Sequence, residues 1–88
     1  MKITPRKPSY FPPRVRAIFS EEAARMDLIP SMLRVPGGHS RRVSLARRRA
    51  AVRLRSMGFS LTQIGLWMNA HHTSVLYMLK KAVTDDRI

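Results

Sequence analysis

Apolar residues recur at helical spacing from about the fourteenth residue onward. In the first such stretch, four of them share one helical face with Glu22: Val15, Ile18, Phe19 and Met26. Their spacing of i, i+3, i+4 and i+11 predicts a helix over about 14–26. A proline then suits a first helical position, so a short helical turn over Pro30 to Leu33 is predicted to bury Met32 and Leu33.

A second long helix is predicted over about 43–57. Its apolar residues step by three or four positions: Val43, Ala46, Ala50, Leu54 and Met57. The segment Pro36-Gly37-Gly38 breaks the chain before this helix. Gly58 is a natural residue just past the helix end, because glycine adopts the left-handed conformation found there.

Two shorter helices are predicted to follow. Ser60 and Gln63 form a capping-box pattern, with Phe59 placed to make a hydrophobic staple with Ile64. The third helix then covers 61–67, the turn is Met68-Asn69-Ala70, and the last helix covers about 71–83. Their inward positions are predicted at Leu61, Ile64, Trp67 or Met68, Val75 or Leu76, Leu79, and Ala82 or Val83. No strand pattern is present, so the predicted fold class is all-α.

The 88 residues are enough for one domain. Residues 1–13 contain four prolines, which predicts an extended basic arm with Tyr10 and Phe11 anchoring its end. Residues 14–83 form the predicted helical domain, and 84–88 form a tail.

Positive charge is concentrated in one segment. The chain has 17 Lys and Arg against 5 Asp and Glu, a formal net charge of +12. Positions 41–58 hold seven arginines and no acidic residue: Arg41, Arg42, Arg47, Arg48, Arg49, Arg53 and Arg55. Because like charges repel, this cluster predicts a polyanionic partner, either nucleic acid or an anionic membrane surface, and favours DNA.

Other chemistries lack the residues they need. With no cysteine, the chain has no disulfide or thiolate zinc site, and His71 and His72 diverge by about 100° on a helix, so no metal site is expected. Serine catalysis lacks an acidic partner. No apolar run approaches the roughly 18 residues of a membrane span, and the basic N-terminus has no secretory signal pattern. We expect a cytoplasmic, nucleoid-associated protein without enzymatic activity or cofactor.

The last two predicted helices have the lengths of a helix-turn-helix. The outer face of the second one offers polar side chains: His71, Thr73, Ser74, Tyr77, Lys80 and Lys81. The first residues of such a helix contact base edges, and short hydroxyl side chains allow close approach.

Three segments carry a more specific signal. They are Ala46-Arg47-Arg48-Arg49, then Ser60-Leu61-Thr62-Gln63-Ile64-Gly65, then His72-Thr73-Ser74-Val75-Leu76 with Lys80-Lys81. Together they resemble the C-terminal DNA-binding domain of the bacterial chromosomal replication initiator, DnaA. That domain has an A-R-x-R element, an S-L-x-x-I-G helix and a D-H-T-T-V recognition signature. The resemblance covers about residues 14–83.

The chain also differs from that family. Its turn is one residue shorter, His71 stands in place of the signature aspartate, Ala70 in place of an arginine, and Ser74 in place of the second threonine. These positions help to read the origin box in the family. No phosphate-binding loop of the G-x-x-x-x-G-K-[ST] type is present, so this chain resembles the DNA reader without the ATPase.

The resemblance implies a role for each matching residue. Arg47 is expected to enter the minor groove of double-stranded DNA. Base contacts in the major groove are expected from His71, His72, Thr73 and Ser74. Phosphate contacts are expected from Arg41, Arg42, Arg48, Arg49, Ser60, Tyr77, Lys80 and Lys81. Phosphate contacts supply affinity, and base contacts supply specificity.

The leading hypothesis is therefore a bacterial or phage protein that binds double-stranded DNA sequence-specifically, as a monomer, in transcription or replication control. The alternative is an adaptor that binds an acidic protein partner, such as a replication or transcription protein, through the arm and the basic helix. A nucleoid-type or RNA-binding protein is a third hypothesis. It is disfavoured because few aromatic side chains are available to stack on single-stranded bases.

Overall fold

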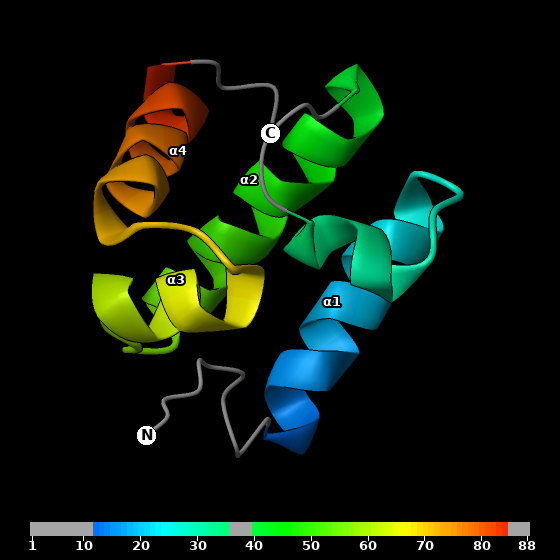
Figure 1. The fold of residues 1–88 in the computed structure, drawn as a ribbon, viewed down its shortest axis with the longest axis horizontal. Coiled ribbons are helices and arrows are strands. Elements are labelled where there is room, and N and C mark those ends of the chain that lie inside the picture. Colours follow the sequence, from blue (N-terminus) through cyan, green and yellow to red (C-terminus); the bar gives the residue numbers. More distant parts are fainter. Residues whose placement is uncertain (1–11, 36–39, 85–88) are drawn as a thin grey trace, which may run out of the picture.

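Helix α2 (Arg41–Ser56) lies at the centre of the molecule. The computed structural model describes residues 12–35 and 40–84, and in these residues α1 (Pro13–Arg25), η1 (Pro30–Arg34), α3 (Leu61–Met68) and α4 (His72–Thr84) all pack against α2 (Figure 1). Element η1 is a turn of 3₁₀ helix. The described residues contain helices and no strand, which confirms the predicted all-α fold class.

The ends of the helices differ from the predicted ones by one or two residues, for local reasons. α1 begins at Pro13, because a proline at the first position has no amide that needs an acceptor. α2 begins at Arg41 because Ser40 caps it, its hydroxyl accepting from the Val43 amide at 3.2 Å. α3 extends through Met68. α4 begins at His72, one residue later than predicted.

The predicted capping box at the start of α3 is confirmed. The Ser60 hydroxyl accepts from the Gln63 amide at 3.1 Å, and the Gln63 side chain accepts from the Ser60 amide at 2.9 Å. Phe59, the predicted staple residue, packs edge-on against Trp67 with ring centroids 4.9 Å apart. Gly58 has a φ of 99°, as expected just after α2.

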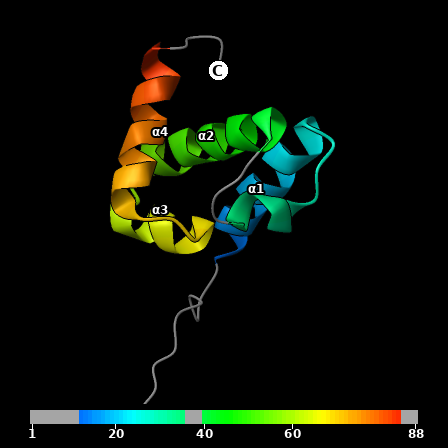
Figure 2. The ribbon, with the colours of Figure 1, turned by 45° about the horizontal axis from the view of Figure 1, so that its top comes forward.

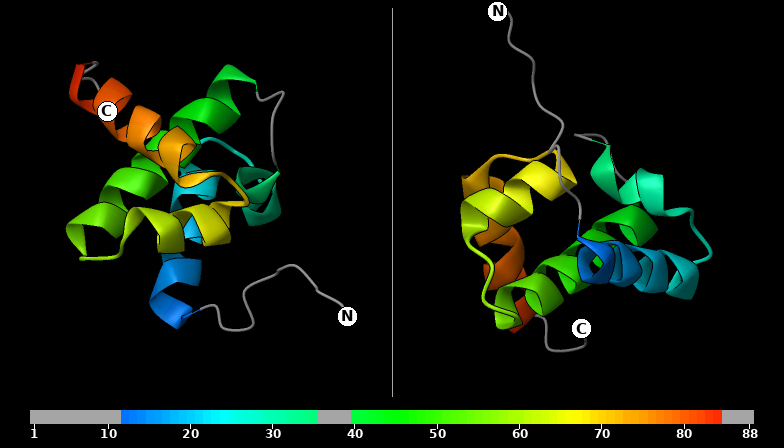
Figure 3. Two further views of the ribbon diagram at one scale, coloured as in Figure 1. Left: turned by 60° about the vertical axis from the view of Figure 1, so that its left-hand side comes forward. Right: turned by 90° about the horizontal axis from the view of Figure 1, so that it is seen from below.

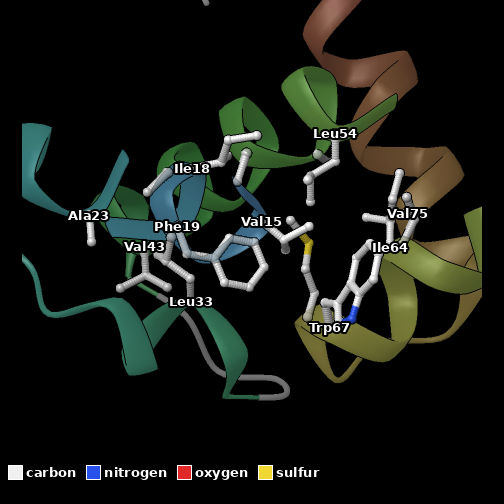
Figure 4. Packing of buried hydrophobic residues seen from close by; sticks show 14 residues of the cluster. Val15, Ile18, Phe19, Ala23, Leu33, Val43, Leu54, Ile64, Trp67 and Val75 are labelled. Atoms are coloured by element: carbon white, nitrogen blue, oxygen red, sulfur yellow. The ribbon is translucent and has the colours of Figure 1, made fainter. Parts of the chain in front are cut away.

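The core is built from every described helix. Leu33 of η1 lies beside Phe19 of α1, and the same cluster contains Val15 of α1, Leu54 of α2 and Ile64 of α3 (Figure 4). The same cluster reaches other buried positions on these elements and on α4: Ile18, Ala23, Val43, Ala46, Ala50, Ala51, Trp67, Met68 and Val75.

Four candidate core positions are exposed instead. Met32, Met57, Leu76 and Val83 have exposed fractions of 37%, 38%, 42% and 81%. A 3₁₀ turn has three residues per turn, and Leu33 occupies the inward position beside Met32. Met57 follows the last residue of α2. Leu76 and Val83 were each one of two alternatives, and the structure buries the alternative Val75 and half-buries the alternative Ala82.

Several predictions concern residues outside those described. These are residues 1–11 of the predicted arm with Tyr10 and Phe11, the break at 36–38, and the tail after Thr84. Pro13, assigned to the arm, belongs to α1. Among the described helices, none combines the length and apolar character needed to cross a membrane.

Candidate functional site

The connection between α3 and α4 is a short, tightly bonded segment of three residues, Asn69 to His71. Asn69 adopts the left-handed conformation, with φ 58° and ψ 50°. The Asn69 amide donates to the Leu66 carbonyl at 3.3 Å, and the Ala70 amide donates to the Gly65 carbonyl at 2.8 Å. This pair of bonds is the Schellman pattern that closes a helix C-terminus.

Gly65 allows this connection to lie against α3. A Cβ atom at Gly65 would lie 2.5 Å from the Ala70 carbonyl oxygen, closer than carbon and oxygen atoms approach without a shift. The backbone of α3 therefore comes this close to the connection because position 65 has no side chain.

His71 caps the start of α4. Its Nδ1 accepts from the Thr73 amide at 3.2 Å and lies 2.8 Å from the Thr73 hydroxyl. Its carbonyl accepts from the amides of Ser74 and Val75. The predicted base-contacting residue His71 thus also fixes where α4 begins.

A groove of about 690 Å³ runs between α2 and α4 and reaches the connection. We call it the α2–α4 groove. Its α2 wall and the connection contribute Ser44, Arg47, Arg48, Asn69, Ala70 and His71, and its α4 wall contributes Thr73, Ser74, Tyr77, Met78 and Lys81. Figure 2 shows α4 crossing α2 steeply, with α3 below them, and Figure 3 gives two further views of the same three helices.

The described residues that line the α2–α4 groove are rich in hydrogen-bond donors and include no carboxylate. Arg48 and Lys81 supply full charges, and hydroxyls come from both walls. All acidic side chains of residues 12–35 and 40–84, which are Glu21, Glu22 and Asp27, belong to α1 or to the turn after it. The described lining of the groove is therefore positively charged, which favours an anionic ligand.

The sequence alone indicated that the arginines of α2 form a cluster without acidic partners. In the structure, two of them pair with carboxylates of α1. Arg49 Nε donates to the Glu22 carboxylate at 2.8 Å, and Arg53 Nη1 donates to the same carboxylate at 3.0 Å. Arg53 also pairs with Glu21 at 2.8 Å. Helix α1 thus neutralises the side of α2 that faces it, and the predicted phosphate contact Arg49 is on that side.

The arginines and carboxylates of this ion-pair cluster stabilise one another in their charged forms. Hydrogen bonds to Glu21 and then to Glu22 raise the pKa of Arg53, so it stays charged. Glu22 is only 1% exposed. Its bonds to Arg49 and Arg53 explain how a carboxylate lies on the otherwise apolar face of α1. A buried carboxylate needs such partners, because an unpaired charge in the core is costly.

Arg47 differs most from its predicted role. Insertion into a minor groove needs an exposed guanidinium, but the Arg47 side chain is 4% exposed. Its Nη1 donates to the Val35 carbonyl at 2.8 Å and its Nη2 to the Met68 carbonyl at 3.4 Å. Burial lowers the pKa of Arg47. The expected minor-groove contact is therefore incompatible with this position of Arg47.

The structure brings together seven of the predicted site residues along the α2–α4 groove: Arg47, Arg48, His71, Thr73, Ser74, Tyr77 and Lys81. Six others lie outside its lining: Arg41, Arg42, Arg49, Ser60, His72 and Lys80. Arg42 donates to the Met26 carbonyl at 2.9 Å, while Ser60 caps α3. His72 is exposed on the first turn of α4, its ring centroid 4.3 Å from that of His71.

Four lining residues were not predicted: Ser44, Asn69, Ala70 and Met78. A helical projection contains the signal for two of them. Ser44 precedes Arg48 by four residues, and Met78 lies between Ser74 and Lys81 at spacings of four and three. Asn69 and Ala70 line the groove through the shape of the connection, which spacing does not specify.

In the part of the chain that the structure describes, no three His, Cys, Asp or Glu side chains are grouped to hold a metal ion. Comparison with models of known protein families gives no match, and neither do comparisons with curated proteins and with solved structures. What the site itself offers is a positive, donor-rich groove beside the exposed polar start of a helix.

Proposed function

We propose that this protein binds double-stranded DNA in a sequence-dependent manner and acts in the control of transcription or replication. The observation that carries the proposal is the α2–α4 groove, which opens beside the start of α4 and whose described lining residues supply cationic and hydroxyl donors and no carboxylate. DNA presents phosphates along both strands, and a surface rich in cationic and hydroxyl donors suits them. The resemblance to the DNA-binding domain of the initiator DnaA supports the same assignment.

In this proposal α3, the short connection and α4 act as a helix-turn-helix, with α4 as the recognition helix. The thirteen residues of α4 correspond to a length of roughly 20 Å, and the major groove of DNA, about 12 Å wide, admits a helix. The start of α4 exposes His72, Thr73 and Ser74. These short or planar polar side chains are suited to base edges.

Affinity and selectivity then come from different residues. Arg48 and Lys81 contact phosphates from opposite walls of the groove, and Arg41 and Lys80 add exposed charge outside it. Thr73 and His71 act as one unit, because the Thr73 hydroxyl lies 2.8 Å from the imidazole. Arg47 is left out of the set that touches DNA.

Selection from a pool of random duplexes at moderate salt tests sequence reading. We expect one motif to be enriched, and a motif without a palindrome would fit a monomer. Ser74→Ala is expected to weaken binding to that motif by about 1–3 kcal/mol while leaving binding to unrelated duplexes unchanged. Ser20→Ala, on an exposed position of α1, is the matched control and should change neither affinity. Affinity that follows charge alone would contradict the proposal.

Phosphate contacts are tested by the dependence of affinity on salt. Arg48→Gln and Lys81→Gln are each expected to weaken binding to all duplexes alike and to reduce the slope of log K against log [salt] by about one unit. Arg14→Gln removes the same charge from an exposed position of α1. An equal loss of slope in Arg14→Gln would mean that binding depends on net charge and not on the groove.

A further inference from the structure

The last four carbonyl groups of α3 are all satisfied, and two of them are satisfied by arginine side chains. The Gly65 and Leu66 carbonyls accept from amides of the connection itself. The Trp67 carbonyl accepts from Arg34 Nε at 2.7 Å, and the Met68 carbonyl accepts from Arg47 Nη2 at 3.4 Å. A helix leaves its final carbonyls without partners in the helix, so these side chains complete the C-terminus of α3.

The two arginines come from parts of the chain that are distant in sequence. Arg34 lies 33 residues before Trp67, at the end of η1, and Arg47 lies 21 residues before Met68, in the middle of α2. Arg47 also donates to the Val35 carbonyl at 2.8 Å, so one guanidinium joins η1, α2 and α3. Positive charge at a helix C-terminus is further favoured by the helix dipole.

These bonds hold the end of α3, which is close in sequence to the start of the proposed recognition helix α4. Met68 is the last residue of α3, and His71, which caps α4, is only three residues further on. The connection between them is pressed against Gly65, so it has little freedom to adjust by itself. The position of the α3 C-terminus therefore sets the position of the first turn of α4.

We propose that Arg34 and Arg47 are positioning residues that close the C-terminal carbonyls of α3 and thereby hold the connection and the exposed start of α4 in place for DNA. The effect on DNA rests on the function proposed above, while the effect on the connection does not. Neighbouring arginines of α2 thus have different roles. Arg48 faces the groove and contacts phosphate, whereas Arg47 acts through α3 without touching DNA.

The test compares Arg47→Met and Arg34→Met, which keep long side chains without donors, with the wild-type chain. In the free protein, hydrogen exchange of the Ala70 and Thr73 amides is expected to accelerate at least tenfold, because both amides are bonded within the held segment. The Val43 amide, bonded to Ser40 at the start of α2, is the internal control and should be unchanged. Arg47→Lys should restore protection in part, since one ammonium group can bond to one of the carbonyls.

The same variants are then titrated with the selected duplex and with an unrelated duplex. The ratio of the two affinities is expected to fall more than tenfold with no change in the salt slope. A salt slope reduced by one unit, with unchanged exchange of Ala70 and Thr73, would mean that Arg47 contacts phosphate directly and would overturn the proposal. Arg34→Met loses the bond to Trp67 from a half-buried side chain and provides the test if Arg47→Met does not fold. If the wild-type chain binds no DNA, the proposed function fails, and the exchange rates still decide the positioning role.

Discussion

Replacing Glu22 with alanine is expected to lower the free energy of unfolding by about 3 kcal/mol. The Glu22 carboxylate is 1% exposed and accepts from Arg49 at 2.8 Å and from Arg53 at 3.0 Å. Its removal leaves Arg49 without this acceptor and Arg53 with Glu21 alone, and it opens a cavity between α1 and α2. The loss is at the lower end for broken buried pairs, because both arginines are partly exposed and can turn toward water.

Urea unfolding of Glu22→Ala and Glu21→Ala distinguishes the effect of losing a buried ion pair from the effect of losing one negative charge on the free energy of unfolding. Glu21→Ala removes the same charge from the adjacent position, but the Glu21 side chain is 58% exposed and pairs with Arg53 at the surface. Exposed pairs contribute little, so Glu21→Ala should cost at most about 1 kcal/mol. Equal losses in the two variants would show that net charge, and not the buried pair, is responsible.

Gly65→Ala is the second substitution with a large expected effect. Its Cβ atom would meet the Ala70 carbonyl oxygen at 2.5 Å, and that oxygen belongs to the backbone, so the connection must move. The cost is expected to be about 2 kcal/mol, typical of overpacked sites. Because His71 follows Ala70, the start of α4 moves with the connection, and preference for the selected duplex should be lost.

Gly58→Ala is the matched control. Gly58 also needs glycine, but for its φ of 99°, and an added Cβ would meet nothing within 4 Å. Its cost is about 1 kcal/mol of backbone strain, and it lies between α2 and α3, away from the groove. Amide chemical shifts of Ala70 and His71 should change in Gly65→Ala and not in Gly58→Ala. Unchanged shifts in both variants would rule out the close approach as a determinant of the site.

Local signals were sufficient for the helices and for the cap of α3, whereas the Ser40 cap of α2 was not predicted. The spacing of apolar residues predicted each helix, and the Ser60 and Gln63 capping box was predicted in detail, because both depend on residues three or four positions apart. The ion pairs of Glu22 depend on residues 27 and 31 positions away, which no local pattern connects. The only hint was a carboxylate on an apolar helix face, which requires a partner.

The position of Arg47 could have been predicted from spacing. It lies four residues after Val43, three before Ala50 and seven before Leu54, within the apolar stripe of α2. The match to a motif favoured a contact with DNA instead. Its partners, the Val35 and Met68 carbonyls, are set by how η1 and α3 pack on α2, so they could not be predicted from the sequence.

The central position of α2 has a consequence for how the domain unfolds. One helix supplies the partners of the acids on α1, the bond to Val35 after η1, the bond to the end of α3 and one wall against α4. Local unfolding needs a boundary that few contacts cross, and α2 leaves no such boundary. The described helices are therefore expected to unfold as one cooperative unit. A substitution that destabilises α1 should also destabilise the start of α4.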